Sequence, residues 1–289
     1  MNAEPIVITT PQQYQLNGMW WGRQNVETVI IGVHGLTSDL FSGLSYYLPL
    51  LSDRTGVVTF NNRGHGFVSS LKKVNKEKKK GYESVLGGTA LEKFEDCVDD
   101  IQGVVEFVKS KGVKKIILAG HSTGCQKSVY YLYKTQNKEQ IAKLVLLSPL
   151  SDYAYAKKFL NPGDFKKSLA IAQDQVKVGK GDDFMPVELT DGELLSAQRF
   201  VSLYDTQSEE ELFTYAHDKK PLAYESVRIP LTVVLPEEDE YKDRDIEEIG
   251  KWFDAHTKSE KYERIIVPGA MHNFKGNEKD VTTVLKKFV

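Results

Sequence analysis

Short apolar runs alternate with amphipathic segments along most of this chain. A short apolar run is typical of a buried strand, and apolar residues recurring every three or four positions are typical of a helix. The predicted strands cover residues 6–9, 15–21, 28–33, 56–60, 116–119, 141–148, 229–235 and 262–267. The predicted helices in this pattern cover residues 41–52, 91–111, 125–133, 245–256 and 278–288. The alternation predicts an α/β fold, with a mostly parallel central sheet, helices on both faces and two antiparallel opening strands.

The pattern changes after Pro149. Residues 151–228 contain no strand-like run, and they predict helices at 163–178, 191–203 and 209–217. Residues 229–289 are too few to form a sheet of their own, which argues against a separate domain. We therefore expect a core domain of residues 1–150 and 229–289, interrupted by a helical cap at residues 151–228.

Residues 120–124 read Gly-His-Ser-Thr-Gly, which is the Gly-x-Ser-x-Gly pattern of a nucleophile elbow. In such an elbow the serine sits on a tight turn between a strand and a helix, with its hydroxyl directed away from the sheet. Side chains at Gly120 or Gly124 would collide with neighbouring backbone. An ordinary glycine-rich turn is the alternative, but the strand before Ser122 and the helix after it favour the elbow.

A serine hydroxyl needs a base within hydrogen-bond reach, and the base needs a carboxylate that orients it. In proteins with this elbow the chain order is serine, acid, histidine. His272 follows the strand at 262–267 through a Pro-Gly turn, and Asp239 follows the strand at 229–235. Asp152, which follows the strand at 141–148, is the alternative acid. All three lie at the carboxyl ends of strands, the edge where such sheets bind ligands.

Backbone N–H groups near Ser122 would form an oxyanion hole, which stabilises the negative charge on a carbonyl oxygen under attack. We expect one N–H from Thr123 and the other from Leu36, with Thr37 as the next choice. The turn at residues 62–66 has two interpretations: a support beneath the site, or a glycine-rich turn with a solvated arginine. We expect Cys125 to be a packed small residue rather than a reactive thiolate.

Composition narrows the functional classes. The net charge of −2 over 289 residues gives no overall field that would attract nucleic acid or a membrane. Two cysteines do not indicate a disulfide framework or a metal site. No secretory signal and no long apolar span is visible, so we expect a cytoplasmic protein. The lysine-rich run at 72–80 is expected to be a solvated loop that could steer an anionic substrate, rather than a nucleic-acid site.

These residues together resemble the α/β-hydrolase superfamily over nearly the whole chain. The resemblance rests on His34-Gly35, the turn at 63–66, the Ser122 elbow, Asp239 and His272. Five segments are similar in sequence to a little-characterised branch of this superfamily that includes fungal siderophore esterases. They are residues 87–94, 119–126, 147–152, 179–183 and 199–203. Pro236 departs from this pattern, because relatives often carry glycine there. The resemblance implies an α/β-hydrolase fold with a helical cap.

We expect a serine hydrolase that acts on a small organic ester. Ser122 would attack the carbonyl, His272 would take the proton, and Asp239 would hold the imidazole, giving an acyl-enzyme that water hydrolyses. This chemistry requires no metal or organic cofactor. Two alternatives remain: an acyltransferase with the same triad, and a non-catalytic ligand-binding protein on this fold. The expected partner is a small-molecule ester, without nucleic acid or membrane, and the chain is expected to be a monomer or homodimer.

Overall fold

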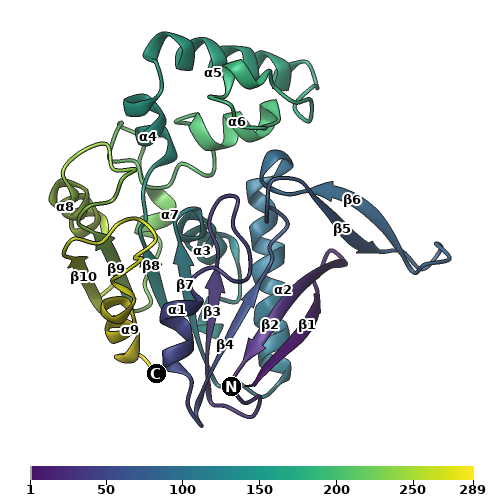
Figure 1. The fold of residues 1–289 in the computed structure, drawn as a ribbon, viewed down its shortest axis with the longest axis vertical. Coiled ribbons are helices and arrows are strands. Elements are labelled where there is room, and N and C mark those ends of the chain that lie inside the picture. Colours follow the sequence, from purple (N-terminus) through teal and green to yellow (C-terminus); the bar gives the residue numbers. More distant parts are fainter. Residues whose placement is uncertain (1) are drawn as a thin grey trace.

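A computed structural model describes residues 2–289, and within them ten strands form one central sheet (Figure 1). The strands are β1 (Ala3–Thr9), β2 (Tyr14–Trp21), β3 (Thr28–Val33), β4 (Thr55–Phe60), β5 (Ser69–Val74), β6 (Tyr82–Gly87), β7 (Lys115–His121), β8 (Ile141–Leu147), β9 (Leu231–Pro236) and β10 (Tyr262–Val267). Their order across the sheet is β10-β9-β8-β7-β3-β4-β2-β5-β6, and β1 pairs with β2.

The six strands from β10 to β4 in this order run parallel, whereas β1, β2, β5 and β6 pair antiparallel. The predicted mostly parallel sheet with antiparallel opening strands is therefore confirmed. Because the central strands are parallel, their carboxyl ends meet at one edge, and helices α4 to α6 lie above that edge (Figure 1).

Helices cover both faces of the sheet, as predicted. They are α1 (Leu44–Tyr47), α2 (Cys97–Ser110), α3 (Thr123–Lys134), α4 (Asp152–Phe159), α5 (Pro162–Lys177), α6 (Ala197–Tyr204), α7 (Leu222–Glu225), α8 (Ile246–His256) and α9 (Glu278–Lys286). Successive residues of β7 point to opposite faces: Leu118 packs in the core cluster shared with α2, α3 and α8, and Ile117 in the cluster shared with α1 and α9. This alternation follows from the two-residue period of a strand.

The predicted helix at 41–52 is much shorter in the structure, because only α1 and a 3₁₀ turn at Leu48–Leu50 form there. Pro49 lies inside that turn, where it cannot donate the backbone hydrogen bond of a longer α-helix. Likewise, the helix predicted at 91–111 begins only at Cys97, after two short 3₁₀ turns.

The segment expected to be a cap packs in two different ways. Helices α4 to α6 share a hydrophobic cluster of their own, which includes Phe165 and Phe200. In contrast, Phe213 and Tyr224 pack in the core cluster that α2, α3 and α8 share with the sheet. The predicted helix at 163–178 matches α5, and the one at 191–203 is confirmed only over its second half. The helix predicted at 209–217 is wrong, because that stretch is irregular.

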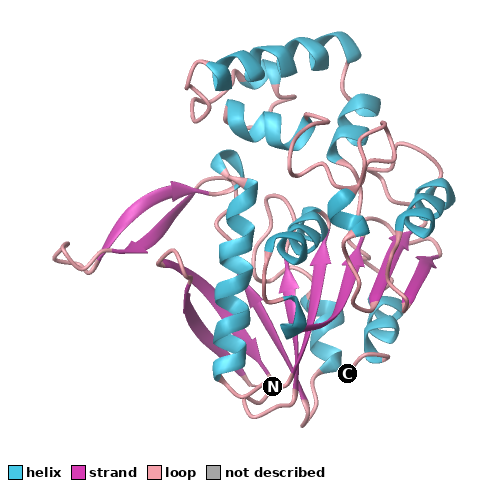
Figure 2. Cartoon of the chain, turned by 180° about the vertical axis from the view of Figure 1, so that it is seen from behind, coloured by secondary structure: helices cyan, strands magenta, loops and turns pink. Residues whose placement is uncertain are grey.

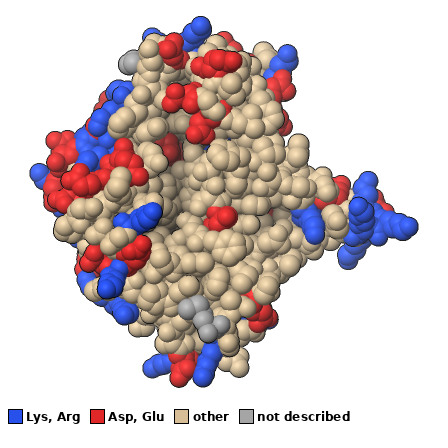
Figure 3. All heavy atoms as spheres, in the orientation of Figure 1, with Lys and Arg blue, Asp and Glu red and all other residues tan. Residues whose placement is uncertain are grey.

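The lysine-rich run at 72–80 belongs to a β-hairpin and not to a simple loop. Strands β5 and β6 form an arm that projects from the body of the molecule (Figure 2), and the lysines gather at its tip (Figure 3). The expectation of a solvated loop holds only for the connection between the strands. Within residues 2–289, no helix combines the length and apolar character needed to cross a membrane.

Candidate functional site

Ser122 lies between β7 and α3 in a strained backbone conformation. Its φ of 54° and ψ of −130° are unusual for a residue with a side chain, and this strain is typical of a nucleophile elbow. A Cβ atom on Gly120 would lie 2.3 Å from the Gly124 carbonyl oxygen. A Cβ on Gly124 would lie 2.2 Å from the Val33 oxygen, so both positions require glycine. The turn therefore has the geometry expected from the sequence.

Asp239 and His272 meet at the end of two neighbouring strands. The Nδ1 atom of His272 lies 2.8 Å from Oδ2 of Asp239. The Asp239 side chain is buried, and its other oxygen accepts a hydrogen bond from the Tyr241 backbone N–H at 3.0 Å. These contacts fix the carboxylate in a position where it orients the imidazole.

Three side chains hold the backbone of His272 in place, and the sequence did not predict this role for any of them. Its carbonyl oxygen accepts hydrogen bonds from Ser148 Oγ at 2.6 Å and from His121 Nε2 at 2.9 Å. Its N–H donates to Glu240 Oε2 at 2.9 Å. Burial and the neighbouring His272 lower the pKa of His121 to about 4, so that ring is neutral at physiological pH. The only sequence signal for these residues is their place at strand ends.

Asp152, the alternative acid, has a different neighbour. It lies in the first turn of α4, and its Oδ2 accepts a hydrogen bond from Gln126 Nε2 at 3.0 Å. The structure therefore brings Asp239, and not Asp152, into contact with the His272 ring.

The loop after β3 lies directly over the nucleophile, because a Cβ on Gly35 would be 2.8 Å from the Ser122 Cβ. Thr123 is the first residue of α3, where a backbone N–H has no partner within the helix. The N–H of Thr37 donates to Thr89 Oγ1 at 2.9 Å, so it is not available to bind an oxyanion. Leu36 therefore fits the second oxyanion donor better than Thr37 does.

His34 connects this loop to the turn at residues 62–66. Its Nδ1 lies 2.9 Å from the Gly35 carbonyl oxygen, and its Nε2 accepts from the Asn62 N–H at 3.2 Å. This pairing requires the neutral tautomer with its proton on Nδ1. Burial, followed by the charge of Lys127, lowers the pKa of His34 to about 3. A neutral His34 thus holds the backbone next to Leu36.

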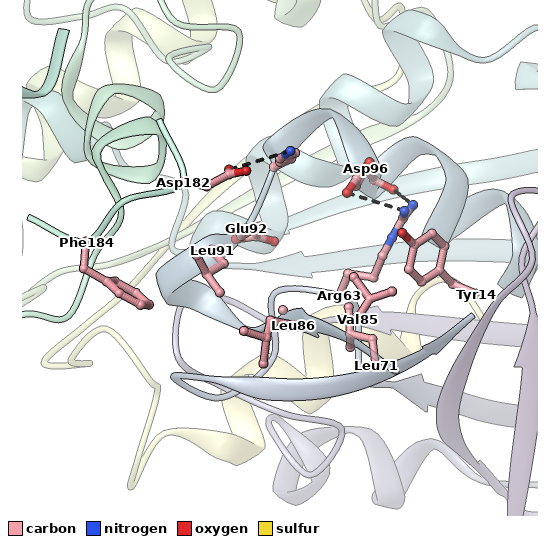
Figure 4. A pocket seen from close by; sticks show the side chains of 12 residues that line it. Tyr14, Arg63, Leu71, Val85, Leu86, Leu91, Glu92, Asp96, Asp182 and Phe184 are labelled. Atoms are coloured by element: carbon pink, nitrogen blue, oxygen red, sulfur yellow. Dashed lines mark hydrogen bonds and ion pairs between the residues drawn. The ribbon is translucent and has the colours of Figure 1, made fainter. Parts of the chain in front are cut away.

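Arg63 is buried and paired, so the interpretation of the turn as one with a solvated arginine is wrong. Its guanidinium lies 2.7 Å from Asp100 and 2.9 Å from Asp99. Arg63 also borders a cavity of about 470 Å³ between the β5–β6 arm and the loop that joins α5 to α6 (Figure 4), and Ser122 does not line this cavity. The turn therefore acts as a rigid support for the loop after β3.

Cys125 is buried, and burial raises its thiol pKa, in agreement with a packing role.

A second cavity, of about 360 Å³, brings most of the predicted site residues together. Its walls are Gly35, Leu36, Thr37, Ser38, Ser42, His121, Ser122, Thr123, Gln126, Leu150, Ser151, Asp152, Tyr155, Glu193, Tyr204, Tyr241, His272 and Asn273. Asp239 lies behind His272. Across residues 2–289, no group of three or more His, Cys, Asp or Glu side chains is arranged to hold a metal ion.

A buried ionic cluster joins helix α6 to the core near this cavity; we define it as Glu92, Lys127, Arg199 and Glu210. Lys127 Nζ lies 2.6 Å from Glu92, and Arg199 Nη2 lies 3.0 Å from Glu92 and 3.1 Å from Glu210. Lys127 belongs to α3, the helix behind Ser122, whereas Arg199 belongs to α6. The cluster therefore fixes α6 relative to the elbow helix.

Comparison with known families identifies this chain. A family model described as "Protein of unknown function (DUF1749)" matches residues 76–289. The chain belongs to the DUF1749 family. This DUF1749 chain is also 30% identical over 138 residues to the UPF0613 protein PB24D3.06c of Schizosaccharomyces pombe. That match covers 44% of the chain and 43% of the relative, so the chain spans less than half the length of the curated relative.

Solved structures resemble the DUF1749 chain over nearly its whole length. A siderophore hydrolase, EstB, from Aspergillus fumigatus is 17% identical, covering 99% of this chain and 95% of that one, with a TM-score of 0.67. Est1E from Butyrivibrio proteoclasticus, solved with ferulic acid, is also 17% identical, with coverage of 98% and 97% and a TM-score of 0.67. The fold is therefore the α/β-hydrolase fold, which confirms the resemblance found in the sequence.

Proposed function

We propose that this DUF1749 protein is a serine hydrolase of small carboxylic esters, with Ser122, His272 and Asp239 as its triad. The observation that carries the proposal is the 2.8 Å contact between His272 Nδ1 and Asp239, at a cavity shared by His272 and the strained Ser122. The solved neighbours support this proposal at the level of fold. EstB is described as a siderophore hydrolase, and Est1E was solved with ferulic acid, an aromatic acid.

In this mechanism Ser122 Oγ attacks the ester carbonyl while His272 Nε2 takes the hydroxyl proton. Asp239 keeps the proton of the neutral ring on Nδ1, which leaves Nε2 free to act as the base. His272 then gives the proton to the leaving alcohol, and the acyl group stays on Ser122. Water, activated by the same imidazole, hydrolyses this acyl-enzyme and restores the serine.

The N–H groups of Thr123 and Leu36 are proposed to bind the oxyanion that forms during both attacks. Thr123 N–H lies at the amino end of α3, where the helix dipole favours negative charge. Leu36 N–H follows Gly35, whose close approach to Ser122 brings this backbone to the carbonyl. Removing one such donor typically costs about 10²–10³ in turnover.

We also propose that residues 151–228 contribute the cap of the site, chiefly through α4 to α6. Tyr155 of α4 and Tyr204 of α6 line the cavity beside Ser122. Side chains from these helices would therefore decide which esters reach the serine. Phe165 and Phe200 instead pack against each other's helices inside the hydrophobic cluster of α4 to α6.

The test is ester hydrolysis by a panel of 4-nitrophenyl esters of graded chain length. Ser122→Ala should lower kcat by about three to six orders of magnitude, as triad deletions do. Ser110→Ala, at an exposed site on α2, is the matched control and should retain full activity. Equal activity of Ser122→Ala and the control on any accepted ester would sink the proposal. Product analysis with added alcohols or amines separates hydrolysis from acyl transfer.

A further inference from the structure

The cavity beside Ser122 contains two carboxylates and no lysine or arginine among its lining residues. The carboxylates are Asp152 and Glu193, and neither forms an ion pair with any residue in 2–289. The nearby buried cations are already engaged, because Lys127 pairs with Glu92 and Arg199 pairs with Glu92 and Glu210. When ionised, Asp152 and Glu193 would therefore give this cavity a negative character that no lining lysine or arginine compensates.

Gln126 holds Asp152 in the wall of this cavity. Its Nε2 donates to the Leu150 carbonyl oxygen at 2.9 Å and to Asp152 Oδ2 at 3.0 Å, and these two bonds fix the orientation of the amide. The residue is only 2% exposed, and its Oε1 has no hydrogen-bond partner among residues 2–289. That oxygen is enclosed by protein, so Gln126 acts on the cavity through the bond that holds Asp152 in place.

Aromatic rings complete this part of the cavity. Tyr155 and Tyr241 pack edge to face with their centroids 5.5 Å apart, and Tyr204 lines the same cavity. The faces of such rings attract cations. Burial, with added effects of Glu210 and Glu211, raises the pKa of Asp152 well above its ordinary value. A cation beside Asp152 would offset the cost of ionising this buried carboxyl group.

We infer that the substrate carries a positively charged amino group, which Asp152 binds beside the ester attacked by Ser122. An ammonium group has three donors and no acceptor, which complements an ionised carboxylate, whose oxygens only accept. An anionic substrate group would instead face Asp152 and Glu193. The lysines of the β5–β6 arm, which by themselves favour anionic substrates, do not line this cavity. The inference rests on the proposed function, because it takes this cavity as the substrate site.

The test compares kcat/KM for matched esters that end in an ammonium, a hydroxyl or a carboxylate group. In one series the group is placed in the acyl chain and in the other in the alcohol. The ammonium ester should exceed the hydroxyl ester by at least tenfold in one series, and the carboxylate ester should be the poorest. Asp152→Asn should reduce the ammonium preference at least fivefold. Asp164→Asn, an exposed aspartate in the first turn of cap helix α5, is the matched control and should keep the preference.

Calorimetry separates this inference from the proposed mechanism. Ser122→Ala should bind n-pentylammonium at least tenfold more tightly than 1-pentanol, and adding Asp152→Asn should abolish the difference. If no ester is hydrolysed, the serine mechanism fails and the binding experiment alone decides the ammonium site. If esters are hydrolysed without a charge preference, or if Asp152→Asn leaves the preference unchanged, the ammonium inference is overturned while the hydrolase proposal stands.

Discussion

Replacing Arg199 with methionine removes the cation that lies between two buried carboxylates. Arg199 is fully buried, and its Nη2 lies 3.0 Å from Glu92 and 3.1 Å from Glu210. In the Arg199→Met variant Glu92 keeps Lys127 at 2.6 Å, but Glu210 loses its cation. Removing one member of a buried pair costs about 3–5 kcal/mol, because the remaining charge stays buried without compensation.

That cost is a large part of the whole stability of a typical domain, which is about 5–15 kcal/mol. Adding Glu210→Gln to Arg199→Met removes the uncompensated carboxylate. The double variant should therefore be more stable than the sum of the single losses predicts, by about 1–3 kcal/mol. This coupling distinguishes a charge effect from a simple loss of packing.

Urea unfolding measures both quantities. Far-UV circular dichroism reports on all helices, whereas the three tryptophans, Trp20, Trp21 and Trp252, lie outside the cap and report on the core. Arg199→Met should lower the unfolding midpoint, with the dichroism transition moving at least as far as the fluorescence transition. Arg23→Met, at an exposed arginine paired with Asp53, is the matched control and should leave the midpoint unchanged. Equal midpoints for the two arginine variants would refute the assignment of this cluster to cap attachment.

Three further outcomes follow from individual contacts. Gly124→Ala should lower the free energy of unfolding by at least about 1–3 kcal/mol and remove most of the activity, because the new Cβ would lie 2.2 Å from the Val33 oxygen. Thermal melting measures this loss, with Gly181→Ala as the control, because a Cβ there would lie 3.3 Å from its nearest neighbour, a side-chain atom. Asp239→Asn should lower kcat by about 10³–10⁴ with little change in melting temperature, and a loss below tenfold in kinetic assays would contradict its role. The pKa of His34 is lowered from 6.5 to about 3, so the unfolded chain binds the proton first as pH falls below 6.5. Stability should therefore drop by about 2 kcal/mol between pH 6.5 and pH 4.5 from this residue, and urea unfolding of His34→Gln should show a correspondingly weaker pH dependence.

The sequence predicted the parts of the fold that rest on local chemistry. Buried parallel strands appear as continuous apolar runs, so β3, β7 and β9 were visible without a structure. The elbow was visible because Gly120 and Gly124 cannot carry side chains there. His272 and Asp239 were predicted because both follow strand ends, although only the structure shows the contact between them.

The sequence did not reveal features that depend on distant partners. Strand β5 carries lysines on an exposed arm, so its composition looked like a solvated loop. Residues 209–217 have a helical pattern, but Glu210 binds Arg199 and Glu211 accepts from Ser151, and these tertiary contacts hold the segment in an irregular path. Charged residues are usually solvated, which is why the ionic cluster of Glu92, Lys127, Arg199 and Glu210 gave no signal.

The central claim is that Ser122 is an activated nucleophile, and intact-protein mass spectrometry after treatment with a fluorophosphonate probe tests it most directly. The account predicts one covalent adduct per chain, located at Ser122 by peptide mapping and absent from Ser122→Ala. It also predicts much slower labelling of His272→Ala, because the hydroxyl then lacks its base. An unlabelled chain, or an adduct that persists in Ser122→Ala, would contradict the account.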